Sequence, residues 1–598
     1  MMKFGSIFHL SSIFKIDLYK FPHFHLKMSF NHILKEIFKF QSLKPFQSKV
    51  VDDMLKDQNI IVISPTGSGK SLCFQLPAML YEGITIVLSP LKSLIYDQVD
   101  SLQKKGINCA LLNSDLGIRK KTILFQELSK KAPSIKMLYT TPEMLMCNEE
   151  TLPIMKKLYD NGLIARIVLD EAHCISTWGH DFRPNYLKVR NLKDLYPTVP
   201  IIALTATATE KVFMDIKDIL GFKDNIKVHT SSFLRDNLKL EIRQRGEKIA
   251  DKKETVKEIA DLLKTKYKGQ SAILYAFSRN ECEKLSEMLI EEEITSDFFH
   301  AGMSSKKRNE IQSKWIDNEL QIICATIAFG MGIDKADVRV VFHFNVPKNI
   351  EGYYQEIGRG GRDKKLSDCI LYYNISDQVK FNQMTNKKKE EIRSKGHTFF
   401  RDKKMNLAEN EAKKLYDMVN FIENEYDCRH IVLCNYFGEK RKDKIGFCGN
   451  LCDNCIRFSS EGAKPKLDVT DEAKKILEYI GRKSEEYIYD TNKDLILKKM
   501  IGYPKKKPKK KLKKDFNGDK SKYDKYKMEY ANKEEEINKF NGDYRLKEKQ
   551  MRRLMMYLTS NKFIKPNIIK NQRGTWIETY QLYKKALKVI DGGKKIAI

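Results

Sequence analysis

Short, wholly apolar runs alternate with longer stretches of helical periodicity through the first two thirds of the chain. The earlier runs are Ile60–Ser64, Ile84–Ser89, Lys136–Thr140, Ile164–Asp170 and Pro200–Thr205. Strands that are apolar at every position and separated by helices are typical of a parallel sheet covered on both faces. The pattern therefore predicts a doubly wound α/β lobe in residues 34–240.

A second series of the same kind predicts another doubly wound α/β lobe in residues 241–376. Its apolar runs are Ser271–Ala276, Asp297–His300, Gln321–Ala325, Arg339–Phe344 and Cys369–Tyr373. Ligands of such sheets bind beyond the carboxyl ends of the strands. Residues with chemical roles are therefore expected directly after these runs.

The pattern changes in the last third of the chain. Residues 377–460 are helical and charged and become rich in cysteine, and residues 467–598 predict a small α/β domain that ends in a two-stranded hairpin. A lysine-rich insertion at 503–545 interrupts this domain. Residues 1–33 form an N-terminal extension that lacks the continuous apolar core of a signal peptide, and no function is assigned to them.

Composition changes the picture mainly through charge. The 598 residues include 108 Lys and Arg against 78 Asp and Glu, which gives a net charge of +30. Cations that neutralise phosphates release condensed counterions, so this excess predicts a polyanionic partner; a lysine-rich solvated surface is the alternative explanation. No apolar run approaches the roughly 18–20 residues that cross a bilayer, so we expect a soluble protein without a membrane partner.

Residues 64–71, Ser-Pro-Thr-Gly-Ser-Gly-Lys-Ser, follow an apolar strand and precede a helix. Glycines let backbone N–H groups surround a phosphate, and the helix N-terminus favours its negative charge. Lys70 is expected to reach the β- and γ-phosphates of ATP, and Ser71 to bind Mg²⁺. A simple Gly/Ser turn is the alternative. The candidate nucleotide-binding residues here are Thr66, Gly67, Ser68, Gly69, Lys70 and Ser71.

Two further segments complete a candidate hydrolytic site. Asp170 and Glu171 directly follow a buried strand; Asp170 is expected to bind Mg²⁺ and Glu171 to orient or deprotonate the attacking water. Arg359 and Arg362 lie three residues apart in the second lobe and are candidates to stabilise charge on the γ-phosphate. Surface salt bridges are the alternative role of these arginines.

Four cysteines near the end of the helical region predict a metal site. They are Cys428, Cys448, Cys452 and Cys455. Four thiolates close a tetrahedral Zn²⁺ site and leave no position for water, so the site is expected to be structural. An iron–sulfur cluster is the alternative metal group, and Cys434 is interpreted as a non-ligand.

From Phe38 to Cys455 the chain resembles RecQ-type DNA helicases of superfamily two, and the resemblance is weaker to about residue 590. Besides the motifs above, it is carried by 88–94, 139–143, 203–208, 325–335 and the aromatic-rich loop 174–184. The resemblance implies two tandem RecA-like lobes, then a helical zinc-binding module at 377–460 and a winged-helix domain at 467–598.

The resemblance also implies roles for further residues. Gln47 would read adenine, with Lys44 standing where the family has Arg, and Gln355 would belong to the ATP site. DNA contacts would come from Ser89, from Trp178, His180, Phe182 and Arg183 of the aromatic-rich loop, and from Trp576 of the hairpin. Bases stack on aromatic faces, although core packing of the loop aromatics and an ordinary surface hairpin at Trp576 are alternatives.

These features together predict an ATP-dependent DNA helicase, and the resemblance implies that it travels 3′→5′. It would move on single-stranded DNA and unwind duplex, branched or forked DNA in recombination, repair and replication, with unidentified protein partners. The lysine block at 504–514 favours a nuclear localisation signal over a DNA-binding insert or a solvated loop. The rival functions are an RNA helicase, a translocase that does not separate strands, and a binding scaffold with a degenerate ATPase.

Overall fold

The structure is a computed structural model that describes residues 30–486 and 551–596 apart from short gaps, among them 331–334, 393–400, 463–467 and 571–575. The chain divides into two compact units, one formed by 1–374 with 427–456 and the other by 375–426 with 457–598. Residues 1–29 and the whole lysine-rich insertion 503–545 lie outside the described part. Among the described helices, none has the length and apolar character needed to cross a membrane.

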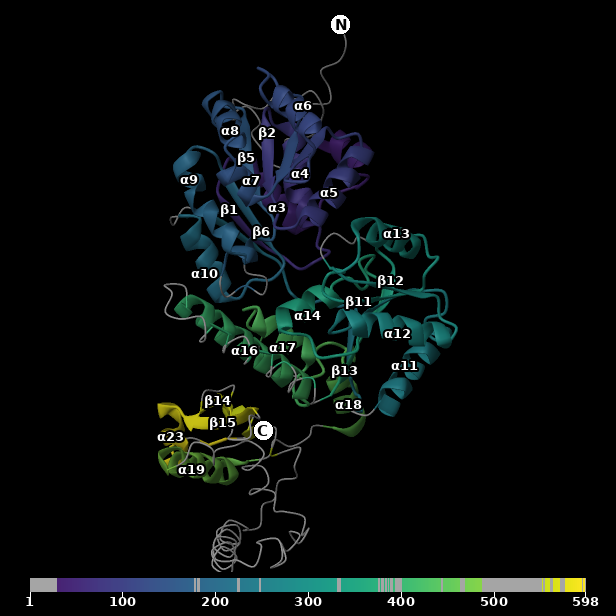
Figure 1. The fold of residues 1–598 in the computed structure, drawn as a ribbon, viewed down its shortest axis with the longest axis vertical. Coiled ribbons are helices and arrows are strands. Elements are labelled where there is room, and N and C mark those ends of the chain that lie inside the picture. Colours follow the sequence, from purple (N-terminus) through teal and green to yellow (C-terminus); the bar gives the residue numbers. More distant parts are fainter. Residues whose placement is uncertain are drawn as a thin grey trace, which may run out of the picture. The chain divides into compact units, whose positions relative to one another are not determined.

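The first unit begins with a seven-stranded parallel sheet whose order is β3-β4-β2-β5-β6-β1-β7 (Figure 1). Five strands match the predicted runs: β1 (Ile60–Ile63), β2 (Ile84–Leu88), β4 (Met137–Thr140), β5 (Ile164–Leu169) and β6 (Ile201–Thr205). The pattern missed β3 (Cys109–Leu112) and β7 (Lys227–Thr230). Both lie at sheet edges. β7 is mostly exposed and needs no apolar run, whereas β3 is apolar but only four residues long.

Helices follow these strands and cover their apolar side chains. They include α3 (Pro45–Met54), α4 (Lys70–Leu80), α5 (Lys92–Lys104), α6 (Ile118–Leu128), α8 (Thr151–Asp160) and α10 (Glu210–Ile219). All side chains of β1, β2, β4 and β6 are buried. This explains why these strands are apolar at nearly every position.

A six-stranded parallel sheet follows, in the order β10-β11-β9-β12-β13-β8. Its strands are β8 (Leu238–Gln244), β9 (Ser271–Tyr275), β10 (Ser296–Phe299), β11 (Ile322–Ala325), β12 (Val338–His343) and β13 (Ser367–Tyr373). The helices α11 (Ile249–Lys264), α12 (Arg279–Glu291), α13 (Ser305–Ile316) and α14 (Ile350–Ile357) accompany it. The prediction of two parallel-sheet α/β lobes is therefore confirmed.

The strand β8 was not predicted, because its polar and apolar residues alternate and only Leu238 and Leu240 are fully buried. It is an edge strand that pairs with β13. Residues 231–237, which we call the linker, connect β7 of the first sheet to β8 of the second.

Residues 427–456 pack against β8. Cys452 forms a bridge with Leu240, and the Ile242 backbone N–H donates to the Asp453 carboxylate at 3.2 Å. The helices α17 (Arg429–Tyr436) and α18 (Asp453–Glu461) belong to this region. The cysteine-rich segment is thus attached to the edge of the second sheet.

The second unit contains α16 (Arg401–Glu423), α19 (Thr470–Glu486) and the predicted hairpin, formed by β14 (Ile564–Lys570) and β15 (Trp576–Leu582). The strands are antiparallel, and Lys570 pairs with Trp576 beside the turn. A core that includes Ile476, Leu558 and Tyr580 joins α19, the segment at 551–558 and the hairpin. A small domain with a terminal hairpin is present, and its winged-helix identity stays a prediction.

Candidate functional site

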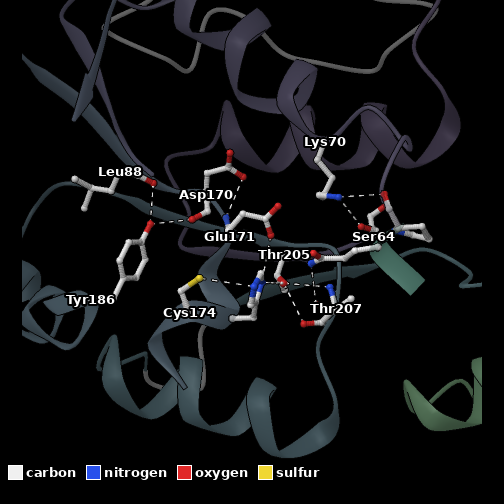
Figure 2. A network of polar contacts seen from close by, with 12 residues as sticks. Ser64, Lys70, Leu88, Asp170, Glu171, Cys174, Tyr186, Thr205 and Thr207 are labelled. Carbon is white, nitrogen blue, oxygen red and sulfur yellow. Dashed lines mark hydrogen bonds and ion pairs between the residues drawn. The ribbon is translucent and has the colours of Figure 1, made fainter. Parts of the chain in front are cut away.

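The loop between β1 and α4 is shaped to receive an anion. Gly67 and Gly69 have φ angles of 77° and 88°, which residues with a side chain rarely adopt. Lys70 begins α4 and donates from Nζ to the carbonyl oxygens of Ser64 at 2.8 Å and Pro65 at 3.1 Å (Figure 2). Burial lowers the pKa of Lys70, although the Glu171 and Asp170 carboxylates oppose this shift. Within the described residues, Ser68 Oγ is buried without a hydrogen-bond partner, as expected of a site that completes its contacts with a ligand.

Asp170 directly follows β5, and its backbone N–H donates to Leu88 O at 2.9 Å. One carboxylate oxygen accepts from Gln98 Nε2 at 3.1 Å and the other from the Glu171 backbone N–H at 3.0 Å. Burial and the neighbouring Glu171 charge raise the pKa of Asp170 to about 6. Because burial disfavours its negative charge, a cation bound beside this carboxylate would stabilise the ionised form.

Glu171 adopts a φ of 50°, a left-handed conformation that is costly for a residue with a side chain. Its carboxylate lies 3.2 Å from His173 Nδ1. Burial opposes ionisation of Glu171, but the contact with His173 and the charges of Lys70 and Arg359 together hold its pKa below the usual value. Burial likewise disfavours the imidazolium, yet the neighbouring Cys174 and Glu171 raise the pKa of His173 to about 10. Glu171 is therefore an ionised acceptor fixed in one position.

A chain of hydrogen bonds leads from this acid to the second lobe (Figure 2). His173 Nδ1 lies 3.0 Å from Thr205 Oγ1, which also accepts from the Thr207 backbone N–H at 3.2 Å. Thr207 Oγ1 in turn accepts from Gln355 Nε2 of α14 at 3.5 Å. The residues after β6 thus connect the acid pair to the helix that precedes the two candidate arginines.

Arg362 lies against the phosphate-binding loop, and Arg359 lies near the acid pair. Arg359 is buried, with 5% of its surface exposed, and its charge favours ionised Glu171. Arg362 Cγ lies 3.5 Å from the position that a Cβ on Gly67 would occupy. A Cβ on Gly358 would lie 3.2 Å from Thr66 Cβ. The structure therefore brings Lys70, the acid pair and the two arginines to one place.

Gln47 lies at the same loop, on α3. Its side-chain oxygen accepts from the Lys44 backbone N–H at 2.9 Å, and its Nε2 donates to Gly69 O at 3.0 Å. Lys44 Nζ donates to Ser68 O at 2.8 Å. Both residues hold the backbone of the phosphate-binding loop in this structure, which is compatible with adenine recognition at its edge but does not test it.

Of the candidate DNA-binding residues, Ser89 is fully buried after β2, and its Oγ has no hydrogen-bond partner within the described residues. Arg183 donates to the carbonyl oxygen of Pro90. Trp178, His180 and Phe182 lie outside the described residues. The backbone of Trp576 belongs to β15, and its side chain is not described. The prediction that these residues bind DNA stays untested.

Sequence reasoning missed two residues of the site. The Tyr186 hydroxyl lies 2.9 Å from Asp170 O and 3.0 Å from Leu88 O and fixes the ends of β5 and β2 (Figure 2). Arg235 of the linker contacts the phosphate-binding loop and the arginine segment. A lone Tyr and a lone Arg in polar stretches carry no periodic signal, and only the fold brings them to the site.

The four predicted metal-ligating cysteines meet in the first unit. Their sulfur atoms all lie within 4.8 Å of one another, and all four residues are buried. A tetrahedral ion with Zn–S distances of about 2.3 Å separates its sulfur ligands by about 3.8 Å, so the cluster fits zinc. Contacts with the Cys428 and Cys448 thiols hold the pKa of Cys452 well below its usual range. Cys434 is buried in α17 and is not a member of the cluster.

Comparisons with known proteins agree with this arrangement. The family model "DEAD/DEAH box helicase" matches residues 44–216, "Helicase conserved C-terminal domain" matches 252–364, and "RecQ zinc-binding" matches 375–456. The chain is similar to the RecQ-like DNA helicase blm-1 of Caenorhabditis elegans, with 39% identity over 475 residues that cover 78% of this chain and 46% of that protein.

Two further relatives have comparable identity. The ATP-dependent helicase SGS1 of Saccharomyces cerevisiae is 40% identical over 451 residues, which cover 75% of this chain and 30% of that protein. The putative ATP-dependent DNA helicase Q1 of Caenorhabditis briggsae is 38% identical over 450 residues, which cover 75% of this chain and 69% of that protein. The chain thus spans less than half the length of the first two relatives and about two thirds of the third.

Proposed function

Because the chain belongs to the RecQ family of DNA helicases, we propose that it is an ATP-dependent motor that moves 3′→5′ on single-stranded DNA and unwinds duplex or forked DNA. The observation that carries the proposal is the convergence of Lys70, the Asp170–Glu171 pair and Arg359 at one site. Phosphoryl transfer needs little covalent help from a protein and depends on positioning and charge stabilisation, which these groups supply.

In the proposed mechanism each group has a distinct task. Lys70, Ser71 and Asp170 would hold ATP with Mg²⁺, which neutralises charge on the β- and γ-phosphates. Glu171 accepts a hydrogen bond from the attacking water and aligns it with the γ-phosphate. Arg359 and Arg362 stabilise the negative charge that develops on the transferred phosphoryl group. Because the arginines belong to the second lobe, hydrolysis depends on the approach of the two lobes.

The link to DNA movement runs through the network behind the acid pair. His173 contacts both Glu171 and Thr205, and Thr207 contacts Gln355 in the second lobe. A change of lobe position therefore alters the support of the water-activating acid. We propose that DNA bound by the aromatic-rich loop 174–184 acts on the same network, because Gly179 packs against the His173 backbone.

Three further statements belong to the same proposal. The four-cysteine cluster holds structural Zn²⁺, because it offers no position for water. The protein acts in recombination, repair and replication of genomic DNA, as the proposed unwinding activity suggests. It does so in the nucleus, which the lysine block at 504–514 supports as a signal of the kind that import receptors bind.

The testing experiment measures ATP hydrolysis with and without single-stranded DNA, beside a Lys70→Ala variant. We expect strong stimulation by DNA that the variant loses, and Arg359→Ala to lower kcat on the order of 10³-fold. Forked DNA and RNA substrates then separate a DNA helicase from an RNA helicase. If the folded, zinc-loaded protein hydrolyses no ATP with or without DNA, the proposal of a motor is wrong. A DNA-binding scaffold would then be the better explanation.

A further inference from the structure

The linker between the two sheets is bound to the ATP site at both of its ends. Ser231 donates from its backbone to Ile63 O at 3.0 Å, and its hydroxyl lies 2.6 Å from Ser64 Oγ. At the other end, Asn237 Nδ2 donates to Gly361 O at 2.7 Å. The first contact is with the start of the phosphate-binding loop and the second with the arginine segment.

Arg235 makes both kinds of contact with one side chain. Its Nη1 donates to Thr66 O of the phosphate-binding loop at 3.1 Å, and its Nη2 donates to Gly360 O at 3.1 Å. The Nε donates to Asn237 Oδ1 at 3.3 Å. A guanidinium is planar and rigid, so these contacts fix the spacing between the loop that holds the phosphates and the segment that carries Arg359 and Arg362.

The linker is in turn held by the cysteine-rich segment. The Glu439 carboxylate accepts from the Phe233 backbone N–H at 2.8 Å and from Ser232 Oγ at 2.9 Å. The Phe233 ring stacks on Phe437 with ring centroids 4.7 Å apart and an interplanar angle of 14°. Burial disfavours ionisation of Glu439, but the hydrogen bonds from Phe233 and Ser232 hold its pKa below its usual value.

A third element joins the same cluster. Tyr354 of α14 packs on Phe437 with centroids 4.9 Å apart, and its hydroxyl donates to Phe233 O at 2.8 Å. All three rings are buried. The helix that leads into the arginine segment, the linker and the end of α17 therefore share one packed contact.

We propose that Arg235 is a positioning residue that sets the spacing between the phosphate-binding loop and the arginine segment, and that Glu439 of the cysteine-rich segment holds Arg235 in place. The proposal rests on the proposed ATPase function. Arg235 acts through backbone carbonyl groups and not on the nucleotide, so it controls how well the arginines reach the transition state. Binding of ATP itself depends on the phosphate-binding loop and changes little.

The test compares Arg235→Lys with wild type in DNA-stimulated ATP hydrolysis. Lysine keeps the charge but cannot bridge two carbonyls in a fixed plane. We expect kcat to fall roughly 10²-fold, as displacement of catalytic groups can cause, and KM for ATP to stay within about threefold. Arg243→Lys is the matched control, because Arg243 is also half-buried but pairs with Glu241 and Glu258 within the second lobe.

A second comparison tests the role of Glu439. Glu439→Gln should also lower kcat, but by a smaller factor than Arg235→Lys. The double variant Arg235→Lys with Glu439→Gln should have the same kcat as Arg235→Lys alone. Zinc content and melting temperature are measured for each protein. Should Arg235→Lys fold poorly, Asn237→Ala removes the Gly361 contact and should also lower kcat without raising KM.

The outcomes separate the two proposals. A rise in KM at unchanged kcat would show that Arg235 binds nucleotide directly and would overturn the positioning role. Equal behaviour of the Arg235 and Arg243 variants, or additive effects of Arg235 and Glu439, would overturn it as well. Absence of hydrolysis by the wild-type protein in the same assay would instead reject the proposed function.

Discussion

Four ionisable side chains, Lys70, Asp170, Glu171 and His173, occupy one buried site, and each shifts the charge state of its neighbours. Asp170 and Glu171 are adjacent acids, and burial and mutual repulsion raise the pKa of Asp170. His173 keeps Glu171 ionised. The pair is thereby divided into one acid ready to bind a cation and one ready to accept a proton or a hydrogen bond.

The raised pKa of Asp170 predicts a pH dependence of nucleotide binding. Below about 6 the carboxyl is protonated, so a proton competes with Mg²⁺, and affinity for the Mg²⁺–nucleotide should fall by up to about tenfold per pH unit. Fluorescence titration from pH 5 to 8 measures it. The Asp170→Asn variant lacks this carboxyl, so the pH dependence of its affinity belongs to the nucleotide alone. An identical pH dependence in both proteins would contradict the assignment.

Gly179 of the aromatic-rich loop packs closely against the His173 backbone. A Cβ there would lie 2.2 Å from His173 O, so Gly179→Ala must displace the backbone next to the acid pair. We expect DNA stimulation of ATP hydrolysis to fall about tenfold or more and stability to fall by about 1–3 kcal/mol. Gly117→Ala is the control, because a Cβ on Gly117 meets nothing within 4 Å. Unchanged stimulation in Gly179→Ala would separate this contact from DNA coupling.

At the scale of elements, the parallel strands bring the site residues together because their carboxyl ends meet at one edge of each sheet. β1, β5 and β6 lead directly into the phosphate-binding loop, the acid pair and the threonines that contact His173. α14 carries Gln355 and Tyr354 on one helix, and so contacts both the first lobe and the cysteine-rich segment. The edge strand β8 anchors that segment through Leu240 and Ile242.

Removal of the metal should destabilise this cysteine-rich element. Cys452→Ala takes away one of four clustered sulfur atoms, and we expect loss of bound zinc with a destabilisation of about 4 kcal/mol or more. Cys434→Ser should keep the metal, because Cys434 lies outside the cluster. Elemental analysis and thermal unfolding measure both effects. Bound iron in place of zinc, or full zinc content in Cys452→Ala, would contradict the assignment.

For the whole molecule, the net charge of +30 is the dominant long-range property. Such a field attracts polyanions and is screened by salt. It favours polyanions of any sequence, which suits the proposed motor on DNA. The charge does not by itself choose between single and double strands.

Salt should therefore weaken DNA binding steeply. If six or more phosphates are contacted, affinity for single-stranded DNA should fall on the order of 10³-fold between about 50 and 200 mM salt. Fluorescence anisotropy with a labelled oligonucleotide measures the slope. Binding that is nearly independent of salt would indicate that stacking, and not phosphate neutralisation, supplies the affinity.

The sequence by itself determined the elements that depend only on residues near to one another in the chain. Strands buried on both faces are mostly apolar, and phosphate-binding loops need glycines in left-handed conformations, so β1, the loop at 64–69 and the acid pair could be predicted. Cysteine spacing likewise predicted the cluster that the structure assembles. The edge strands β7 and β8 were missed because a partly exposed strand needs no continuous apolar run, and β3 was missed although its four residues are apolar.

Only the tertiary structure decided which distant residues meet. Tyr186 lies at Asp170, Gln355 at Thr207, and Arg235 between Thr66 and Gly360. Each is a single polar residue whose partner is far away in the chain, and periodicity cannot encode such a contact. The residues that give the ATP site its chemistry could therefore be predicted from the sequence. The residues that connect the two halves of the site could not, because their contacts depend on how the two sheets fold together.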